Sequence, residues 1–362
     1  MSRRSDTEAP VLIMAGGTGG HVFPALAVAD ALRARGVPVV WLGTRDGLEA
    51  RVVPEAGVAV EWLTVRGLRG KGAVGWLMAP ARVLRATLQA AGAMRRQRPR
   101  TVLGMGGYVA GPGGLAAWLL RYPLVIHEQN ARAGLTNRLL ARLACRVLAG
   151  FPDVFPGRRS QVTGNPVRGE ILRLQPPQRR PQREGRCRLL ILGGSLGALA
   201  LNDTVAGALA LLPENERPEV CHQAGERTIE VARQAYAGTG VEAEVTAFIT
   251  DMAAAYAWAD LVICRAGALT VSELAIAGVP AVLVPLPHAV DDHQTANARQ
   301  LVDAGAAVLV PQPELTAERL SDELRGLMAD RSRLQDMARA ARAVARPDAA
   351  ETVAECCLEV AL

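Results

Sequence analysis

Two short glycine-rich stretches, one in each half of the chain, have residue types suited to phosphate binding. The first is GGTGGH from Gly16 to His21, and the second is GGSLGA from Gly193 to Ala198. Glycine has no side chain to keep a ligand away, and it permits the positive φ values that tight turns need. Backbone N–H groups in such turns can point outward, and the positive end of a following helix attracts anions. Each stretch therefore predicts an anion site.

The elements that position these turns follow from the apolar residues around them. The apolar residues 11–14 (VLIM) predict a strand before the first turn, and a helix is expected to start near Pro24, because proline is tolerated in a first turn. The second turn follows a similar apolar stretch at 189–192. This repeated strand, glycine turn and helix indicates α/β architecture with parallel sheets.

Other polar or glycine-rich clusters also follow short apolar stretches. They are residues 104–108 after 101–103, 127–130 after 123–126, 265–273 after 261–264, and 288–297 after 281–285. Ligands of open α/β sheets bind at the carboxyl ends of strands, so these clusters are candidate binding segments. A third anion-binding turn is expected from Arg265, an apolar helix is expected over 115–120, and Asp251 is expected to cap a helix over 252–258.

Length and composition predict two domains. The chain has 362 residues, which exceeds one ordinary hydrophobic core. Residues 175–183 (QPPQRRPQR) cannot build a core and are typical of a linker or an exposed loop. The predicted domains are residues 1–168, completed by a C-terminal helix over 345–362, and residues 169–344.

The charge and cysteine content narrow the classes of partner. The net charge of +6 comes mostly from arginine, which suits nucleic acid, an anionic bilayer or a phosphorylated substrate. With only four Phe and four Tyr, nucleic acid is not an expected partner. The six cysteines form no C-x-x-C pair, which favours a reducing compartment without a zinc site. Neither a signal peptide nor a membrane-spanning helix is expected.

Several motifs in a fixed order resemble a known family. Besides the two glycine turns, they are FPALA at 23–27, GMGGYVAGP at 104–112, HEQN at 127–130, TGNPVR at 163–168 and ALTVSE at 268–273. Over nearly the whole chain they resemble the bacterial peptidoglycan glycosyltransferases that convert lipid I to lipid II. The resemblance implies the GT-B fold, in which two Rossmann-like domains face a central cleft. The first domain would bind the acceptor and the membrane, and the second would bind UDP-N-acetylglucosamine (UDP-GlcNAc).

The resemblance also implies an inverting reaction. N-acetylglucosamine would pass from UDP-GlcNAc to the 4-hydroxyl of the N-acetylmuramoyl unit of undecaprenyl-pyrophosphoryl-N-acetylmuramoyl-pentapeptide (lipid I), forming a β-1,4 bond in cell-wall synthesis. The enzyme would act as a peripheral protein on the cytoplasmic face of the inner membrane, and no cofactor would be required. Other cell-wall synthesis proteins are left open as partners.

The family's substrate contacts fall on residues of both halves of the chain. They are Thr18, Gly19, Gly20, Asn130, Arg168, Ser195, Ile249 at the uracil, Ala268, Leu269, Thr270, Val271, Ser272 and Glu273 around the pyrophosphate and ribose, and Gln294 at the sugar. The Glu273 carboxylate can accept hydrogen bonds from both ribose hydroxyls. Arg168 and Ser195 would neutralise the charge on the leaving UDP. As alternatives, Arg168 forms only a surface ion pair and Ser195 only caps a helix.

His21 is the candidate base for the acceptor hydroxyl. A helix N-terminus disfavours an imidazolium, which suits a group that accepts a proton. Glu128 and His127 are the alternates, a structural role for His21 stays open, and so does the identity of the base. Residues 291–293 (DDH) lack the D-x-D arrangement of metal-dependent glycosyltransferases, so no metal site is expected.

A lipid-linked acceptor implies contact with an anionic membrane surface. Basic and interfacial side chains that could supply it are Arg66, Arg69, Lys71, Trp76, Leu77, Met78, Arg82, Arg85, Trp118 and Arg121. An ordinary helix with a solvated face is the alternative.

Three other functions compete with this hypothesis. Another UDP-sugar-dependent glycolipid or natural-product glycosyltransferase, or a UDP-GlcNAc epimerase, would share the donor half of the chain. A dinucleotide oxidoreductase is disfavoured, because no turn has G-x-G-x-x-G with an acidic residue about 20 positions later. A non-catalytic sugar-nucleotide sensor would not need His21.

Overall fold

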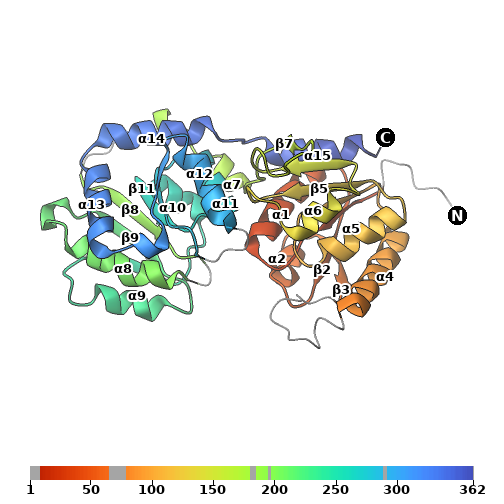
Figure 1. Cartoon of the computed structure of the whole chain (residues 1–362), viewed down its shortest axis with the longest axis horizontal. Coiled ribbons are helices and arrows are strands. Elements are labelled where there is room, and N and C mark those ends of the chain that lie inside the picture. The colour runs from red at the N-terminus through yellow and green to blue at the C-terminus, as the bar shows by residue number, and fades with distance from the viewer. Residues whose placement is uncertain (1–8, 65–78, 180–184, 195–196, 288–291, 362) are drawn as a thin grey trace. The chain divides into compact units, whose positions relative to one another are not determined.

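The computed structural model describes residues 9–64, 79–179, 185–194, 197–287 and 292–361, and it is drawn in Figure 1. The chain divides into two compact units. Unit 1 comprises residues 1–168 and 346–362, and unit 2 comprises residues 169–345. The C-terminal segment thus returns to the unit in which the chain starts.

Unit 1 is built on a seven-stranded sheet in the order β3-β2-β1-β4-β5-β6-β7. Its strands are β1 (Val11–Met14), β2 (Val39–Thr44), β3 (Ala59–Leu63), β4 (Thr101–Gly104), β5 (Leu124–Glu128), β6 (Arg146–Ala149) and β7 (Gln161–Val162). Every neighbouring pair is parallel, and Val11 of β1 pairs with Val39 on one side and Thr101 on the other. The inner strand β1 is buried along its whole length, which explains its uninterrupted apolar sequence.

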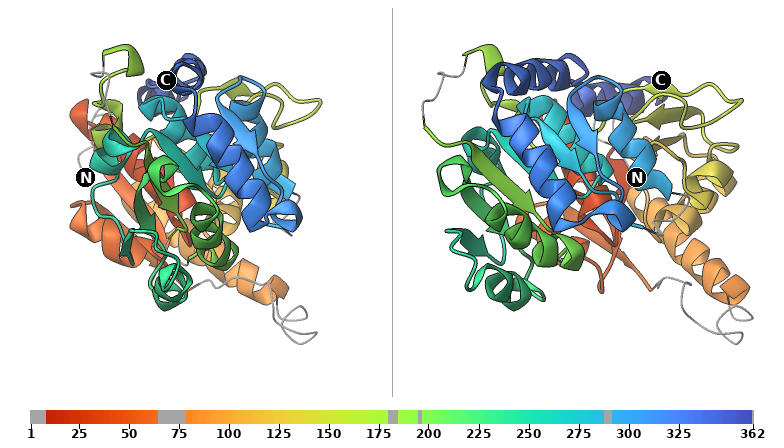
Figure 2. Two further views of the ribbon diagram at one scale, coloured as in Figure 1. Left: turned by 90° about the vertical axis from the view of Figure 1, so that its left-hand side faces the viewer. Right: turned by 60° about the vertical axis from the view of Figure 1, so that its left-hand side comes forward.

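Helices cover both faces of this sheet (Figures 1 and 2). They are α1 (Gly19–Ala34), α2 (Glu49–Glu55), α4 (Ala79–Gln97), α5 (Ala110–Leu119), α6 (Leu135–Leu140) and α15 (Ala349–Glu359). Ile13 of β1 shares a buried cluster with Val28 of α1 and Val353 of α15. Met14, the next residue along the strand, instead lies against Gly113 of α5. Successive strand residues point to opposite faces, so α5 lies opposite α1 and α15.

Two predicted helix starts were wrong, each by five residues. Helix α1 begins at Gly19 rather than near Pro24, which places His21 inside the first turn. Helix α5 begins at Ala110 rather than Leu115, so the neighbouring glycines belong to the helix and not to a turn. Packing explains these glycines, because a Cβ on Gly113 would lie 2.2 Å from the sulfur of Met14.

Unit 2 contains a second parallel sheet, with six strands in the order β10-β9-β8-β11-β12-β13. The strands are β8 (Arg188–Leu192), β9 (Glu219–Gln223), β10 (Glu244–Thr246), β11 (Leu261–Cys264), β12 (Ala281–Leu283) and β13 (Ala307–Leu309). The helices are α7 (Gly169–Leu172), α8 (Leu199–Ala210), α9 (Ile229–Tyr236), α10 (Met252–Trp258), α11 (Ala268–Ala277), α12 (His293–Val302), α13 (Ala317–Met328) and α14 (Arg331–Ala343).

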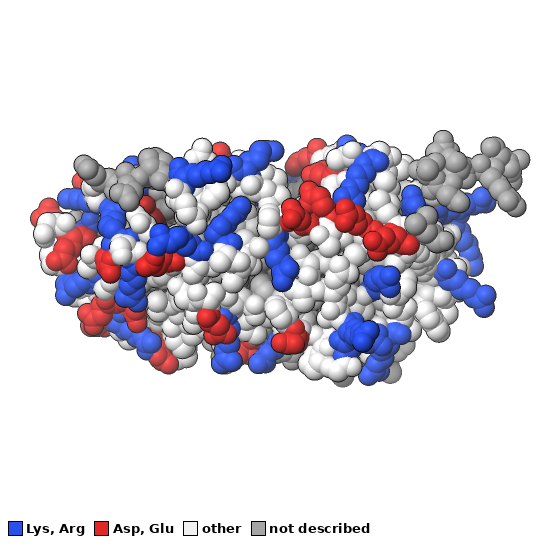
Figure 3. Space-filling model, turned by 90° about the horizontal axis from the view of Figure 1, so that it is seen from above, with Lys and Arg blue, Asp and Glu red and all other residues white. Residues whose placement is uncertain are grey.

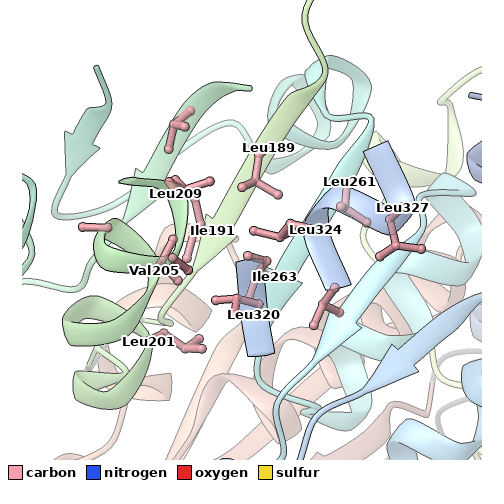
Figure 4. Close-up of a cluster of buried hydrophobic side chains, with 14 of the residues drawn as sticks. Leu189, Ile191, Leu201, Val205, Leu209, Leu261, Ile263, Leu320, Leu324 and Leu327 are labelled. Carbon is pink, nitrogen blue, oxygen red and sulfur yellow. The ribbon is translucent and has the colours of Figure 1, made fainter. Parts of the chain in front are cut away.

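The core of unit 2 forms where alternate strand residues meet two helices. Ile191 of β8 and Ile263 of β11 belong to one buried cluster with Val205 of α8 and Leu324 of α13 (Figure 4). The two helices contribute residues at helical spacing, namely Leu201, Val205 and Leu209 from α8, and Leu320, Leu324 and Leu327 from α13. The expected cap of α10 is confirmed, because the Ala254 N–H donates to the Asp251 carboxylate at 2.8 Å.

The surface mixes charges of both signs. Figure 3 shows one face of the molecule, on which basic and acidic side chains are interspersed. One ion pair joins Arg35, just after α1, to Glu355 of α15 at 2.8 Å, and both side chains are partly exposed. Such an exposed pair contributes at most about 1 kcal/mol. None of the described helices is long and apolar enough to cross a membrane.

A buried carboxylate fixes the first glycine turn in unit 1. The Glu49 side chain is fully buried. One of its oxygens accepts the Gly17 N–H at 2.9 Å, and the other accepts the Thr44 N–H at 3.0 Å and the Thr44 hydroxyl at 2.6 Å. A Cβ on Gly16 would lie 2.6 Å from a Glu49 oxygen, so only glycine permits this approach. Glu49 therefore ties the turn after β1 to the end of β2.

Replacing this carboxylate should destabilise the protein. Glu49→Ala leaves three donors without their acceptor, and we expect the free energy of unfolding to fall by about 1–3 kcal/mol. Glu55→Ala, an exposed position at the other end of α2, is the matched control and should change it by less than about 0.5 kcal/mol. Urea denaturation measures both. Equal stabilities of the two variants would contradict the role given to Glu49.

A buried histidine in unit 2 predicts a second, pH-dependent effect. His222 is fully buried, with Nδ1 3.0 Å from the Tyr236 hydroxyl and Nε2 3.1 Å from the Asn202 side-chain oxygen. Burial lowers the pKa of His222 to about 4. The unfolded chain, with a histidine pKa of about 6.5, binds the proton first as pH falls. The stabilising contribution is therefore complete above pH 6.5 and is lost progressively toward pH 4.

Between pH 6.5 and pH 4, the titration of His222 alone should lower the free energy of unfolding by up to about 1.4 kcal/mol for each pH unit that the pH falls. We expect the wild type to lose about 1 kcal/mol more than His222→Gln between pH 7 and pH 5.5, because glutamine does not titrate. Urea denaturation of both proteins at the two pH values measures this difference. The same loss in both would show that His222 is not the source.

Candidate functional site

The unit 1 candidate site begins at the first turn of α1. Thr18 caps this helix in an extended conformation, and its carbonyl accepts the N–H groups of His21 and Val22, each at 3.1 Å. Gly19 and Gly20 follow in the first turn, where backbone N–H groups have no acceptor within the helix. Thr18, Gly19, Gly20 and His21 therefore lie together at the positive end of α1.

The glycine turn itself offers less to an anion than its sequence suggests. The Gly17 N–H does not point outward but donates to the buried carboxylate of Glu49. That negative charge lies directly behind the turn and opposes a second anion at Gly17. The donors left to a ligand are those of the helix start, at Gly19 and Gly20.

The turn between β4 and α5 packs against this site. Gly106 and Gly107 have φ values of 99° and 82°, which favour glycine. A Cβ on Gly107 would lie 2.2 Å from the Gly16 carbonyl oxygen, and a Cβ on Gly106 would lie 2.6 Å from Nδ1 of His21. These two glycines allow one backbone turn to contact both the other turn and the His21 ring.

The end of β5 supplies the partner of His21. Nδ1 of His21 lies 3.0 Å from the side-chain oxygen of Gln129, and Gln129 is buried. Through its other amide atom, Gln129 reaches Nδ1 of His127 at 3.2 Å. His127 is fully buried, and burial lowers its pKa to about 4. His21 is half-buried and therefore retains contact with solvent.

Glu128 occupies a different environment from His21. One oxygen of its buried carboxylate accepts the backbone and side-chain N–H groups of Asn130, both at 3.1 Å. The other accepts the Gly134 N–H at 3.1 Å and the Asn137 side-chain amide at 2.9 Å. With both oxygens engaged, Glu128 organises the loop between β5 and α6, and Asn130 is held by it.

Arg168 lies at the end of unit 1. Its guanidinium carbon is 5.5 Å from the centre of the Phe23 ring, a distance typical of a cation–π contact. Phe23 belongs to α1, so the contact brings Arg168 to the helix that carries His21.

The glycine turn of unit 2 has its described backbone donors engaged. The Gly193 N–H donates to the Gln223 backbone carbonyl at 2.8 Å, and the Gly194 N–H donates to the Gln223 side-chain oxygen at 3.1 Å. The Gly197 N–H closes the turn on the Gly194 carbonyl at 3.0 Å. Outward-pointing donors were therefore the wrong expectation for these three residues. Ser195 lies outside the described residues.

The start of α11 is the stronger candidate for an anion site in unit 2. Gly267 caps the helix with extended backbone, and no side chain caps it. Ala268, Leu269 and Thr270 form its first turn, where N–H groups have no helical acceptor. One turn further, the Ser272 hydroxyl donates to the Ala268 carbonyl at 2.9 Å, and Val271 is buried.

Glu273 is buried on α11 and held by a tyrosine. The Tyr256 hydroxyl, from α10, donates to one Glu273 oxygen at 3.1 Å. A carboxylate has about four acceptor positions, so this bond orients Glu273 without exhausting it.

The loop after β12 is fixed by two side chains. Gln294 accepts the Leu286 N–H at 2.9 Å. The Arg265 guanidinium donates to the carbonyls of Val284 and Pro285 at 3.1 and 3.3 Å and to Gln312 at 2.6 Å. Arg265 therefore supports this loop, which differs from its expected place in an anion-binding turn.

Ile249 lies after β10 at the sheet edge and is half-buried. Apart from Ser195, which is not described, the predicted residues of unit 2 thus follow the carboxyl ends of β10, β11 and β12. Those of unit 1 occupy the carboxyl ends of β1 and β5, together with Arg168 after β7.

Sequence reasoning missed three supporting residues. Glu49 and Tyr256 each lie outside the motifs and contact a motif residue through a buried oxygen. Gln129 lies inside HEQN but was given no role. The only sequence feature that could have indicated these residues was a polar residue among neighbours expected to be buried. Its hydrogen-bond partner could not be identified without the fold.

Two family models match the two units of the chain separately. Residues 11–149 match the glycosyltransferase family 28 N-terminal domain, and residues 188–353 match the glycosyltransferase family 28 C-terminal domain. The matches lie in unit 1 and almost wholly in unit 2, respectively.

Similar curated proteins carry one functional name. A UDP-N-acetylglucosamine--N-acetylmuramyl-(pentapeptide) pyrophosphoryl-undecaprenol N-acetylglucosamine transferase from Alkalilimnicola ehrlichii is 66% identical over 353 residues, covering 97% of this chain and 99% of that protein. The enzyme of the same name from Nitrosococcus oceani is 61% identical and covers 97% of this chain and 98% of its own.

Solved structures match over the full length as well. The crystal structure of Acinetobacter baumannii MurG has a TM-score of 0.83 and 45% identity, covering 96% of this chain and 99% of that one. The kitacinnamycin glycosyltransferase, at 19% identity, a TM-score of 0.71 and coverage of 98% and 99%, shares the GT-B fold alone. The chain belongs to glycosyltransferase family 28, among the N-acetylglucosamine transferases of lipid II formation.

Proposed function

We propose that this protein transfers N-acetylglucosamine from UDP-GlcNAc to the 4-hydroxyl of the N-acetylmuramoyl unit of lipid I, forming lipid II with inversion at the anomeric carbon. The observation that carries the proposal is the 66% identity to a transferase of that name over 353 residues. Two features support it on chemical grounds. Unit 1 holds a half-buried histidine at a helix N-terminus, and unit 2 holds a buried carboxylate on a helix with an open N-terminus.

Unit 2 is the proposed donor unit. The first-turn N–H groups of Ala268, Leu269 and Thr270 suit the UDP diphosphate, because they combine free donors with the positive end of α11. Glu273, oriented by Tyr256, would accept the ribose hydroxyls. Val271 and Ser272 lie between these two parts of the helix.

The remaining donor contacts are proposed from the resemblance. Ile249 would contact the uracil, and Gln294 would contact the sugar. Asn130, Arg168 and Ser195 would contact the donor as UDP leaves. Arg168 supplies a positive charge, whereas Ser195 supplies a hydroxyl donor.

Unit 1 is the proposed acceptor unit, with His21 as the base. His21 takes the proton of the acceptor hydroxyl while that oxygen bonds to C1 of N-acetylglucosamine. The bond from C1 to the β-phosphate oxygen breaks, and UDP leaves with the electron pair. Donors that meet the growing charge on the β-phosphate lower the barrier most, which is the role proposed for the α11 N-terminus and Arg168.

His21 suits this role better than Glu128. A base must present a lone pair to the substrate, but both Glu128 oxygens already accept two N–H groups each. Glu128 is thereby assigned to hold the loop that carries Asn130.

No metal or other cofactor is part of this proposal. Stabilisation of the leaving group is assigned to backbone donors and Arg168. The described residues contain no group of three or more histidine, cysteine, aspartate or glutamate side chains that could hold a metal ion. Independence of metal stays a prediction.

An anionic membrane surface is the proposed site of action, because the acceptor is lipid-linked. Helices α4 and α5 pack together in unit 1. They expose Leu84, Leu88, Trp118 and Leu119, and Arg82 and Arg85 on α4 and Arg121 just after α5 are exposed as well. Apolar side chains with nearby arginines bind anionic bilayer surfaces. The predicted residues 66–78 lie outside the described residues.

Purified protein supplied with UDP-GlcNAc and a lipid I analogue should release UDP and form the disaccharide product. His21→Ala should lower kcat by about 100-fold or more, because general-base catalysis contributes on the order of 10²–10⁴. UDP-GlcNAc affinity should stay unchanged. EDTA should not lower the rate.

The assay separates the alternatives. A different acceptor or epimerisation of UDP-GlcNAc would replace this function, and UDP-GlcNAc binding without turnover would indicate a sensor. Near-normal turnover of His21→Ala would remove His21 as the base, and EDTA inhibition reversed by Mg²⁺ would overturn metal independence.

Vesicle sedimentation tests the membrane surface. Replacing Leu84, Leu88 and Trp118 by serine should weaken binding to anionic vesicles, because less apolar surface enters the interface. Serine at Leu199 and Leu211 of unit 2, which are about equally exposed, is the matched control. Equal binding of the two variants would exclude α4 and α5 as the docking surface.

A further inference from the structure

We propose that His127 and Gln129 are positioning residues that hold neutral His21 as the tautomer with its proton on Nδ1, leaving Nε2 as the basic atom. The inference rests on the proposed role of His21 as base. It is carried by a chain of hydrogen-bonding atoms that runs from the Gly164 carbonyl through His127 and Gln129 to His21.

The Gly164 carbonyl determines which atoms of this hydrogen-bonded series donate and which accept. It lies 2.9 Å from Nε2 of His127, and a carbonyl oxygen can only accept, so Nε2 of His127 carries the proton. Only glycine suits this position, because Gly164 has a φ of 83° and a Cβ there would lie 2.5 Å from the Cβ of Arg346. The Thr163 hydroxyl donates to the same oxygen at 2.9 Å.

The position of the proton on His127 in turn determines the orientation of the Gln129 side-chain amide. Burial lowers the pKa of His127 to about 4, so the ring is neutral near pH 7. With the proton on Nε2, its Nδ1 has a lone pair and must accept. The atom 3.2 Å away is therefore the NH₂ group of the Gln129 amide.

Gln129 then determines the tautomer of His21. Because its NH₂ group faces His127, its carbonyl oxygen faces Nδ1 of His21 at 3.0 Å and can only accept. Nδ1 of His21 therefore carries the proton. Gln129 cannot easily turn, because it is buried and its backbone carbonyl accepts the Asn165 side-chain amide at 3.0 Å.

The consequence is a base with a defined reactive atom. Neutral His21 presents the Nε2 lone pair, accepts the hydroxyl proton there and becomes an imidazolium. Its Nδ1–H stays on the Gln129 oxygen throughout, so no proton needs to travel along the chain. This assignment also gives a purpose to residues 163–165 (TGN), because the Gly164 carbonyl contacts the His127 ring and the Asn165 amide holds the backbone of Gln129.

The tautomer can be measured without substrate. The protein has five histidines, so ¹⁵N-histidine labelling with a His21→Gln spectrum for assignment isolates the His21 ring nitrogens by NMR. We expect a protonated Nδ1 and an unprotonated Nε2 for His21 in the folded wild type above its titration. A protonated Nε2 would overturn the proposal even if the transferase reaction is confirmed.

Two substitutions at Gln129 separate positioning from structure. Gln129→Met removes both amide contacts, and we expect a mixture of His21 tautomers with kcat about 10- to 100-fold lower and an unchanged KM for UDP-GlcNAc. Gln129→Glu keeps an acceptor for Nδ1–H, so it should retain the tautomer and more of the rate than Gln129→Met. Gln97→Met, a partly buried glutamine bonded to Glu61, is the control with unchanged kcat.

His127→Leu tests the part of the hydrogen-bonded series that does not contact His21. It leaves Gln129 in place but removes the lone pair that orients its amide, so the tautomer mixture should appear here too. A pure Nδ1–H tautomer in both Gln129→Met and His127→Leu, each shown to be folded by circular dichroism, would overturn the proposal. Failure of lipid I to react with the wild type would instead count against the proposed function, and the tautomer result would stand.

Discussion

Parallel pairing of every strand is the constraint on which both candidate sites depend. Because all strands of a sheet run the same way, their carboxyl ends share one edge, and the loops that carry polar residues meet there. In unit 1 this edge gathers the glycine turn after β1, the turn after β4 and the end of β5. Residues more than 100 positions apart, such as His21 and Gln129, thereby come within 3.0 Å.

Polar groups at this edge act mainly on one another. Glu49 takes the Gly17 N–H, Glu128 takes four N–H groups from Asn130, Gly134 and Asn137, and Tyr256 donates to Glu273. A buried carboxylate is costly without such donors, so Glu49 and Glu128 each fix their local backbone, whereas Glu273 is oriented by the Tyr256 side chain. What is left for a substrate are the groups that no neighbour engages within the helix, at the first turns of α1 and α11.

The alternation of apolar strands and helices was readable from sequence, and the structure confirms the parallel α/β architecture. The residues at which helices begin were harder to predict from the sequence. Pro24 and the glycines at 111–114 are typical of helix boundaries, yet they lie inside α1 and α5. Close contacts such as that of Gly113 with Met14 join residues far apart in sequence, so no local pattern reveals them. The same limit hid the partners of Glu49, Gln129 and Tyr256.

The two glycine turns therefore have similar sequences, but the groups around them differ. In unit 2 the described N–H groups of the turn bond within unit 2, to Gln223 and Gly194, and the open donors lie instead at α11. In unit 1 a buried carboxylate occupies the turn and disfavours an anion at Gly17, while the adjacent helix start carries a histidine. A glycine turn thus permits another group to come close to its backbone. The residues packed against the turn determine which group that is. Behind Gly16 and Gly17 that neighbour is the buried Glu49 carboxylate, so the donors left to a ligand beside His21 are those of the helix start at Gly19 and Gly20.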